Sequence, residues 1–439
     1  MKYIYTLLFA LSITAINPWG FLRGEIWTGP KVFLVLLISL TNLLILWKER
    51  EFVKFDKHEK ISFLLWQVFL GIGLLSTLQS PFPLRSLFGQ EQMGDGWLYW
   101  LIIATFTLSN TLVLKLYPNL FRCQLNGLLI GGIILAISIY PQVIDWKIDY
   151  TVTMGQVIKE NILASTIFQN QQPIGLYSHR GHAAFVLAAI SVLFLVSWQE
   201  KWLGAVPTTM ALIVMIPALV LTQTRAGVLA LLGASVYLLG RRYYKLLITA
   251  FLGGLLIVLL LGSQRQIDNL PGIKQMTSDR IYLWELSLKG ISIRPLLGWG
   301  MNGFGIAYPF VFSEREKPQV VNLGDLSFDY IGKNGQVRSR IIPTYKVHNL
   351  ILDMTLSVGV LGMLSYTALF GFYWWRGMLT PSRERSVPSG VRIATVIICY
   401  FIFTFTWFEC AQFTHLVWWA LSLWRASHFP FGSQSAQYQ

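Results

Sequence analysis

Runs of about 20 apolar residues limit the fold of this chain more than any other feature. Such runs lie at residues 3–19, 31–47, 61–79, 97–114, 124–140, 182–198, 204–222, 226–240, 246–262, 348–374, 393–409 and 411–424. A helix needs about 20 residues to cross the hydrocarbon core of a bilayer. Only 13% of the residues are charged, against about 25% in a soluble protein. The sequence therefore predicts an all-α polytopic membrane protein with about 12 transmembrane helices.

Basic residues in the short linkers predict the orientation of these helices. The linker 48–60 contains five Lys or Arg and the linker 241–245 contains three; the segments 115–122 and 376–392 are also basic. Cytoplasmic loops are enriched in Lys and Arg, and all four segments fall on the cytoplasmic side if both termini are cytoplasmic. The same rule accounts for much of the net charge of +14. Since no nucleic-acid-binding module is recognisable, we expect no nucleic-acid partner.

One long polar segment, 263–347, separates two groups of apolar runs. We expect a bundle of nine transmembrane helices in 1–262, a large, partly helical periplasmic loop at 263–347, and three further helices with a cytoplasmic tail in 348–439. The loop contains eleven Lys or Arg and seven Asp or Glu, so its net charge is 11 − 7 = +4. A basic loop on the outer face predicts an anionic partner.

A short amphipathic helix is predicted inside this loop. Thr277, Ser278 and Asp279 form a plausible helix start, because Ser and Asp side chains cap free backbone N–H groups. The apolar residues Ile281, Trp284 and Leu288 then recur at helical spacing, and Pro295 and Gly298 follow them. We expect this helix to lie on the membrane surface or on the membrane helices.

Four arginines are candidates for binding an anion at the outer face. Arg225 lies between two apolar runs, where an arginine is costly unless it is paired or faces water; the alternative is a snorkelling residue in a tight turn. Arg280 opens the predicted amphipathic helix and either binds a phosphate or pairs with a neighbouring carboxylate. Arg180, in SHRGHAAF, is a candidate of the same kind, and Arg85 is a weaker one.

His348 lies where the polar loop ends and an apolar run begins, in KVHNLILDMTLSVGVLG at 346–362. The pKa of histidine is near neutrality, so its ring can accept a proton from a hydroxyl group. A lone histidine at a helix start is equally a structural residue in many proteins, and spacing does not decide between the two. Asn349, Asp279 and Arg294 are weaker candidates for the same site.

Motifs of several other reaction classes do not occur. GWGMNG at 298–303 matches G-x-G-x-x-G, but no predicted strand precedes it, so we interpret its glycines as turn residues. His179 and His182 have the H-x-x-H spacing without a third ligand, and the three cysteines form no CxxC, so we expect no metal site. The sequence contains no nucleotide-binding P-loop, no H-E-x-x-H and no outward Asp-x-Asp. This argues against an ATP-driven pump and against a metal-dependent oligosaccharyltransferase.

Three segments occur in a familiar order: TQTRAG at 222–227, SDRIYLWELSLKGISIRPLLGWGMNGFG at 278–305 and VHNLILDMTLSVGVLG at 347–362. Together they resemble the O-antigen ligase family, whose members show an Arg turn, D-R-x-x-x-W followed by P-x-x-G-x-G, and H-[NS]-x-x-L with a later Gly. The stretch at 88–97 is similar to the family's early G-x-x-x-R-x-x-G loop, with Gln92 where an Arg is common.

The resemblance implies a glycosyltransferase of the cell inner membrane without a cofactor. The implied donor is a glycan on undecaprenyl diphosphate, and the implied acceptor is a lipid-linked or protein-linked hydroxyl on the periplasmic side. His348 matches the family's essential histidine, and Arg225 and Arg280 match its phosphate-binding arginines; Arg180 matches less closely. The segment 263–347 matches the family's large periplasmic loop, with helices over a membrane-embedded cavity.

Two other functions stay open at the level of sequence. A polymerase of the same family would extend the lipid-linked glycan instead of handing it to another acceptor. A transporter of inorganic carbon or another anion would also suit twelve membrane helices with basic residues beside them. Transporters usually contain internal repeats and broken helices at the midplane, and we find no repeat in this sequence.

Overall fold

The structure, a computed structural model, describes residues 1–143, 173–240, 271–312, 319–332, 334–379 and 389–423, without the side chains of 271–279, 377–379 and 389–393. The bundle consists of α1 (Lys2–Thr14), α2 (Gly29–Lys48), α3 (Lys57–Leu78), α5 (Trp97–Leu116), α6 (Leu120–Val143), α9 (Arg180–Gln199), α10 (Ala205–Leu221), the helix Arg225–Gly240, α14 (Leu350–Leu379), α15 (Ser389–Thr406) and α16 (Thr414–Ser422). The remaining elements are the π-helix η1 (Gly24–Thr28), α4 (Pro83–Phe88), α12 (Pro271–Ile293), α13 (Gly303–Val311), β1 (Gln319–Leu323), β2 (Ser327–Ile331) and β3 (Val337–Ile341).

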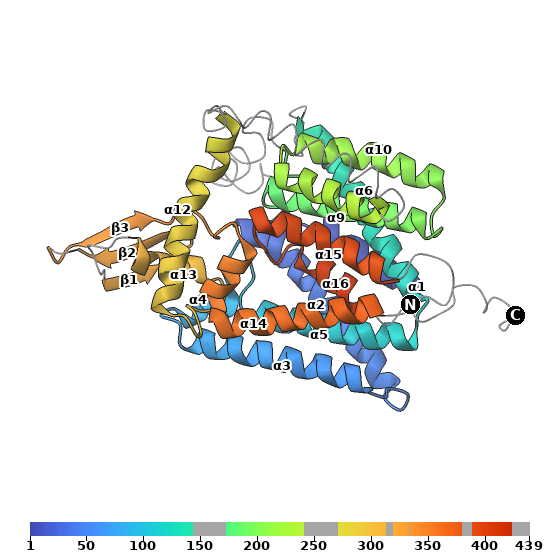
Figure 1. Cartoon of the computed structure of the whole chain (residues 1–439), viewed down its shortest axis with the longest axis horizontal. Helices are drawn as coiled ribbons and strands as arrows, with labels where there is room; N and C mark the ends of the chain where they lie inside the picture. The colour runs from blue at the N-terminus through green and yellow to red at the C-terminus, as the bar shows by residue number, and fades with distance from the viewer. Residues whose placement is uncertain (144–172, 241–270, 313–318, 333, 380–388, 424–439) are drawn as a thin grey trace, which may run out of the picture.

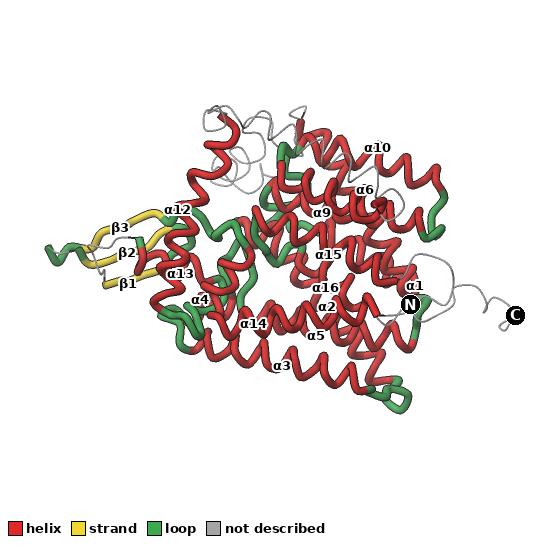
Figure 2. The backbone as a smooth tube through the Cα atoms, in the orientation of Figure 1, coloured by secondary structure: helices red, strands yellow, loops and turns green. Residues whose placement is uncertain are grey.

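The bundle helices lie side by side along the long axis of the molecule, and α12, α13 and the strands gather at one end (Figures 1 and 2). Glycines allow some helices to approach closely. A Cβ on Gly127 of α6 would lie 2.4 Å from the carbonyl oxygen of Thr6 in α1. The bundle centre is aromatic: the rings of Trp66 and Trp418, both buried, have centroids 4.6 Å apart.

Helices cover eleven of the twelve predicted apolar runs; the run 246–262 lies outside the described residues. Six helices of the described chain are long and apolar enough to cross a membrane, namely Gly24–Lys48, Lys57–Leu78, Trp97–Leu116, Leu120–Val143, Arg180–Gln199 and Leu350–Arg376. Four shorter apolar helices and α16 make up the rest. A helical, multi-pass membrane protein is therefore confirmed, while the number of twelve spans stays a prediction.

Several basic segments meet at the end of the bundle opposite to the strands. The Lys115 ammonium donates to the carbonyl oxygen of Lys54 at 2.6 Å, and the Tyr117 hydroxyl donates to Glu49 at 2.8 Å. The linker after α2 thus lies beside the turn after α5. The start of α3 also meets the end of α14, since the hydroxyls of Ser62 and Tyr373 are 2.6 Å apart. The basic segment 241–245 lies outside the described residues.

The long helix of the polar segment begins earlier than the sequence predicted. α12 starts at Pro271 and not near Asp279. Proline suits the first turn of a helix because its missing N–H would have no partner there. Arg280 therefore lies within α12 and does not open it, so the prediction that it sits at a helix start is wrong.

α12 also buries a different face from the one expected. Leu283, Leu286 and Gly290 are buried against the rest of the polar segment, whereas Ile281 and Leu288 are 49% and 56% exposed. The spacing of the buried residues, i, i+3 and i+7, is that of a single helix face. The helix therefore has one apolar face inside the protein and apolar residues on its outer side.

A three-stranded antiparallel sheet in the order β1-β2-β3 lies in the polar segment, which the all-α prediction did not include. In β2, Phe328 and Tyr330 face a small core shared with α12 and α13. β2 and β3 pair from Ser327 opposite Ile341 to Ile331 opposite Val337. The turn between them contains Asn334-Gly335, with Gly335 at φ 73°. Asn-Gly between two alternating segments is a hairpin signal and could have predicted these strands.

α14 is kinked at Gly359, whose φ of 71° is not helical. The loop 295–300 enters this kink and pairs with its backbone. The N–H of Val360 donates to the carbonyl oxygen of Pro295 at 2.8 Å, and the N–H of Gly300 donates to that of Ser357 at 2.9 Å. The positive φ of Gly300, 106°, confirms that the glycines of 298–303 serve a turn. The hydrogen bonds between the loop 295–300 and α14 hold the first half of this helix in place. This half directly follows His348.

Candidate active site

His348 lies in the segment that leads into α14, with a left-handed backbone (φ 61°) that is uncommon outside glycine. Its Nδ1 is 3.2 Å from the carbonyl oxygen of Lys346. A carbonyl oxygen only accepts, so this hydrogen bond assigns the proton to Nδ1 and leaves the lone pair on Nε2. Nε2 has no hydrogen-bond partner within the described part of the chain. The rings of Trp407 and Phe408 pack edge-on against the imidazole at 5.1 and 4.9 Å between centroids.

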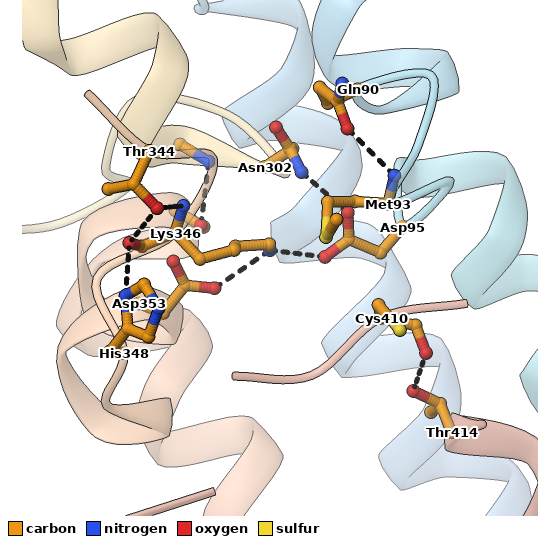
Figure 3. A network of polar contacts seen from close by, with 12 residues as sticks. Gln90, Met93, Asp95, Asn302, Thr344, Lys346, His348, Asp353, Cys410 and Thr414 are labelled. Atoms are coloured by element: carbon orange, nitrogen blue, oxygen red, sulfur yellow. Dashed lines mark hydrogen bonds and ion pairs between the residues drawn. The ribbon is translucent and has the colours of Figure 1, made fainter. Parts of the chain in front are cut away.

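A buried ionic network adjoins His348 (Figure 3). The ammonium of Lys346, a residue 2% exposed, pairs with Asp95 and with Asp353, the latter at 2.9 Å. The amide of Asn302 donates to the second oxygen of Asp95 at 2.6 Å. Burial alone would lower the pKa of Lys346, but the two carboxylates outweigh it and raise that pKa.

This network fixes the backbone that holds His348. It joins the segment before α14 to α14 itself and to the loops at 89–96 and 298–303. Removing one partner from a buried ion pair leaves an uncompensated charge and costs about 3–5 kcal/mol. The Lys346 side chain therefore anchors the chain, while its carbonyl group orients the imidazole of His348.

The start of α9 brings a second histidine to the same place. Nδ1 of His179 accepts a hydrogen bond from the N–H of Gly181 at 3.0 Å, so its proton is on Nε2. The His179 ring lies 5.4 Å from that of Trp407, the same ring that packs against His348. Burial, followed by the charges of Arg180 and other neighbours, lowers the pKa of His179 to about 3. The imidazole of His179 is therefore neutral, and its Nε2–H can donate a hydrogen bond. The ring itself packs against Trp407.

Arg280 acts on His348 from α12. Burial and then the positive charge of Arg280 lower the pKa of His348 to about 4, so this imidazole is neutral at physiological pH. Arg280 is therefore close enough to His348 for its charge to act on the imidazole; a shared role of the two residues stays a prediction. Arg180 and Arg280 are both partly exposed, and within the described chain neither guanidinium has a hydrogen-bond or ion-pair partner.

Arg225 lies on a helix that contains neither Arg280 nor His348. It is the exposed first residue of the helix Arg225–Gly240. Two residues later, a Cβ on Gly227 would lie 2.9 Å from Ala184 in the first turns of α9. The two helices therefore start side by side, so Arg225 and Arg180 are on the same face of the bundle.

Three weaker candidates have structural partners. Arg85 forms an ion pair with Asp325 at 2.7 Å. Asn349 caps α14, since its side-chain oxygen accepts from the N–H of Leu352 at 3.1 Å. Arg294 donates to the carbonyl oxygen of Gln79 at 2.9 Å and lies over the ring of Trp299. Each of the three side chains is thus held by at least one contact within the protein. The side chain of Asp279, the fourth weaker candidate, lies outside the described residues.

The sequence did not indicate three residues of this site, namely Arg23, Lys346 and Trp407. It indicated His179 only as a possible metal ligand and not as a hydrogen-bond donor. The charge of Arg23 helps to lower the pKa of His179, which places it at this site. Arg23 could have been found, because it lies between the first two apolar runs on the same predicted outer face as Arg225. Asp353 is seven residues from Lys346, but Asp95 is 251 residues away, so no local pattern indicates the complete network.

The arrangement combines a neutral proton acceptor, a neutral N–H donor and several guanidinium groups. Within the described residues, no group of three or more His, Cys, Asp or Glu is placed to hold a metal ion. Positive charge close to a neutral base suits the attack of a hydroxyl group on a substrate whose leaving group is anionic.

Residues 210–367 match the family model described as O-antigen ligase. The match includes Arg225, Arg280 and His348, and it spans α12, α13, the sheet and the first part of α14. The matched range makes up 158 of the 439 residues, and this part of the chain is similar to the O-antigen ligase family. This similarity supports a membrane glycosyltransferase of the group that contains the O-antigen ligases and polymerases. His179 and Arg180 lie outside the matched range. No curated protein matches the sequence.

Proposed function

We propose that this O-antigen ligase homologue transfers a glycan from an undecaprenyl-diphosphate carrier to an acceptor hydroxyl on the periplasmic face of the inner membrane. The observation that carries the proposal is the position of His348: its Nε2 is free to accept a proton and lies within the field of Arg280. A neutral base next to unpaired positive charge suits a hydroxyl acceptor and a diphosphate donor. Neither His348 nor the arginines need a metal or a cofactor for these roles.

In the proposed reaction, Nε2 of His348 takes the proton of the acceptor hydroxyl while its oxygen attacks the anomeric carbon of the donor. A new carbon–oxygen bond forms as the bond from this carbon to the diphosphate oxygen breaks. The electron pair of the broken bond leaves with the diphosphate. A single displacement of this kind inverts the anomeric centre, and a positioned base contributes about 10²–10⁴-fold to the rate.

Arg280, Arg180 and Arg225 are proposed to stabilise the negative charge of the diphosphate. The planar guanidinium group matches phosphate oxygens in two parallel hydrogen bonds. Arg180 and Arg225 also begin helices, whose free N–H groups and positive dipole ends favour an anion. His179 adds a neutral N–H donor that can bind a substrate oxygen without competing for the proton that His348 accepts.

The proposed sidedness follows from the basic linkers. We assign both termini to the cytoplasm, which places His348 and the polar segment 263–347 at the periplasmic face. The lipid bilayer and a lipid-linked donor are then partners on the side where His348 and Arg280 lie. The acceptor is a lipid-linked or protein-linked hydroxyl.

Reconstitution of the full chain in liposomes with an undecaprenyl-diphosphate glycan tests the proposal. We expect transfer to a hydroxyl acceptor, with or without a metal chelator. His348→Ala should lower the initial rate by at least about 10²-fold, because the base is lost, and Arg225→Ala should abolish transfer. Both variants should reach the membrane in normal amounts, since Arg225 is exposed and His348 is only partly buried at the end of the bundle.

Arg338→Ala is the matched control. Arg338 is an exposed arginine of β3 at the same end of the molecule, and its loss should leave the rate unchanged. A fully active His348→Ala protein would remove the mechanism. The group attached to the reducing end of the product separates two activities: a distinct acceptor means a ligase, and a second lipid-linked glycan means a polymerase.

A further inference from the structure

A cavity of about 520 Å³ lies at the end of the bundle opposite to His348. It is half open and is lined by the last turns of α2, the first turns of α3, the second half of α5 and the linker between α2 and α3. Its volume lies within the range of about 300–1,000 Å³ typical of small-molecule sites. Most of its wall is apolar and includes Leu43, Leu46, Phe63, Leu108 and Leu112.

Nearly all polar groups in the wall already have partners inside the protein. The Ser62 hydroxyl bonds to Tyr373 at 2.6 Å, and the hydroxyls of Thr105 and Thr111 donate to backbone carbonyls of α5 at 2.8 and 2.9 Å. Ser109 accepts from Asn42 at 3.2 Å. The cavity wall therefore offers an occupant apolar contact and few hydrogen bonds.

Arg50, at the mouth of the cavity, is the exception. Its side chain is exposed and has no hydrogen-bond or ion-pair partner within the described part of the chain. Glu59 also lines the cavity, but its carboxylate pairs with Lys115 at 2.9 Å. Glu49 accepts a hydrogen bond from Tyr117, and Glu51 is exposed. An apolar cavity with one free cation at its mouth is complementary to an apolar chain that ends in an anion.

We propose that this cavity binds one anionic phospholipid of the cytoplasmic leaflet, with an acyl chain along α5 and the phosphate on Arg50. The proposal does not depend on the transfer reaction, since the cavity and His348 lie at opposite ends of the bundle. It also differs from the general attraction of basic linkers to anionic membranes, because it requires a single saturable site with an apolar interior.

Native mass spectrometry of the delipidated full chain in detergent tests this site. Phosphatidylglycerol or phosphatidylcholine with identical acyl chains is added, and the number and affinity of retained lipids are measured. We expect one phosphatidylglycerol to be retained at a concentration that leaves phosphatidylcholine unbound. Arg50→Gln should weaken phosphatidylglycerol binding about five-fold, as expected for one cation near a lipid phosphate. Leu108→Trp, which fills the cavity, should weaken both lipids.

Lys60→Gln is the control, since Lys60 is an exposed cation at the same end of α3 but does not line the cavity. Three results would overturn the proposal: equal binding of the two lipids, equal losses in Arg50→Gln and Lys60→Gln, or displacement of phosphatidylglycerol by a polyprenyl phosphate at far lower concentration. The last result would assign the cavity to the carrier lipid. Arg50→Gln alters an exposed side chain only, so a folding defect will not obscure the comparison.

Discussion

His348 and His179 have opposite hydrogen-bonding roles because Nδ1 of His348 donates to a backbone carbonyl group, whereas Nδ1 of His179 accepts from a backbone N–H. The carbonyl of Lys346 fixes the proton of His348 on Nδ1, and the N–H of Gly181 fixes that of His179 on Nε2. One ring can then accept a proton and the other can donate a hydrogen bond. The sequence indicated His348 and Arg280 by their order in the chain. It could not show that Arg85, Arg294 and Asn349 are occupied elsewhere, because the partners of the two arginines lie far from them in sequence.

The pKa of His348 predicts the acid limb of the activity profile. The neutral ring is the active base, so activity is present above its pKa and is lost below it. Because burial and Arg280 lower this pKa from 6.5 to about 4, kcat/KM should stay level from neutral pH to about pH 5 and fall only below that. kcat/KM is the appropriate measure because it reports ionisations of the free enzyme.

The variant Arg280→Gln tests whether the charge of Arg280 contributes to the low pKa of His348. Removing this charge should move the acid limb to higher pH, though not as far as 6.5, because burial is the larger cause and remains. Arg338→Gln, the exposed control on β3, should leave the limb where it is in the wild type. An acid limb near pH 6.5 in the wild-type protein would contradict the assignment of His348 as a buried neutral base.

α14 shows how one residue joins two elements. Gly359 interrupts the helix with φ 71° and ψ −179°, a conformation that is essentially restricted to glycine. A Cβ at this position would lie 2.1 Å from the carbonyl oxygen of Leu296. The kink therefore admits the loop 295–300 and sets the direction of the first half of α14. The sequence contains a glycine at this position, but no pattern in it predicts that the loop 295–300 pairs with the helix backbone.

Gly359→Ala should destabilise the protein. The backbone conformation alone costs on the order of 1–3 kcal/mol for a residue with a side chain, and the clash with a carbonyl group adds to it because backbone atoms cannot rotate away. We expect a clear fall in the unfolding temperature in detergent, together with reduced transfer because the His348 segment shifts.

Gly371→Ala in the same helix is the control. A Cβ there meets nothing within 4 Å, and alanine favours the helix over glycine by up to about 1 kcal/mol. The unfolding temperature should stay the same or rise slightly. Equal stability of the two variants would show that the kink does not depend on Gly359.

The bundle separates two chemical environments at its two ends. The strands, α12 and α13 lie at one end of the bundle (Figure 1). His348 and His179 belong to this end, and the apolar cavity with the linker after α2 belongs to the other. Alternating helix directions place the starts of α9 and α14 together at the first end, although about 170 residues separate His179 from His348 in the chain. The positive-inside rule then predicts which end faces the cytoplasm.

Cysteine labelling tests this topology. In a protein whose three native cysteines are replaced, Gln336→Cys in the β2–β3 turn should react with a membrane-impermeant thiol reagent added to spheroplasts. Glu51→Cys in the linker after α2 should react only after the membrane is opened. Both positions are exposed, so accessibility in the folded protein is matched. The reverse pattern would invert the orientation and place His348 at the cytoplasmic face.

The sequence by itself determined the class of protein, the positions of most membrane helices and the candidates Arg225, Arg280 and His348. These follow from local patterns: apolar length, charge in the linkers and the order of short motifs. Only the tertiary structure decided the ion pair of Lys346 with Asp95 and the packing of His179 on Trp407, because each of these contacts joins residues distant in sequence. Burial among such contacts also lowers the pKa of His348.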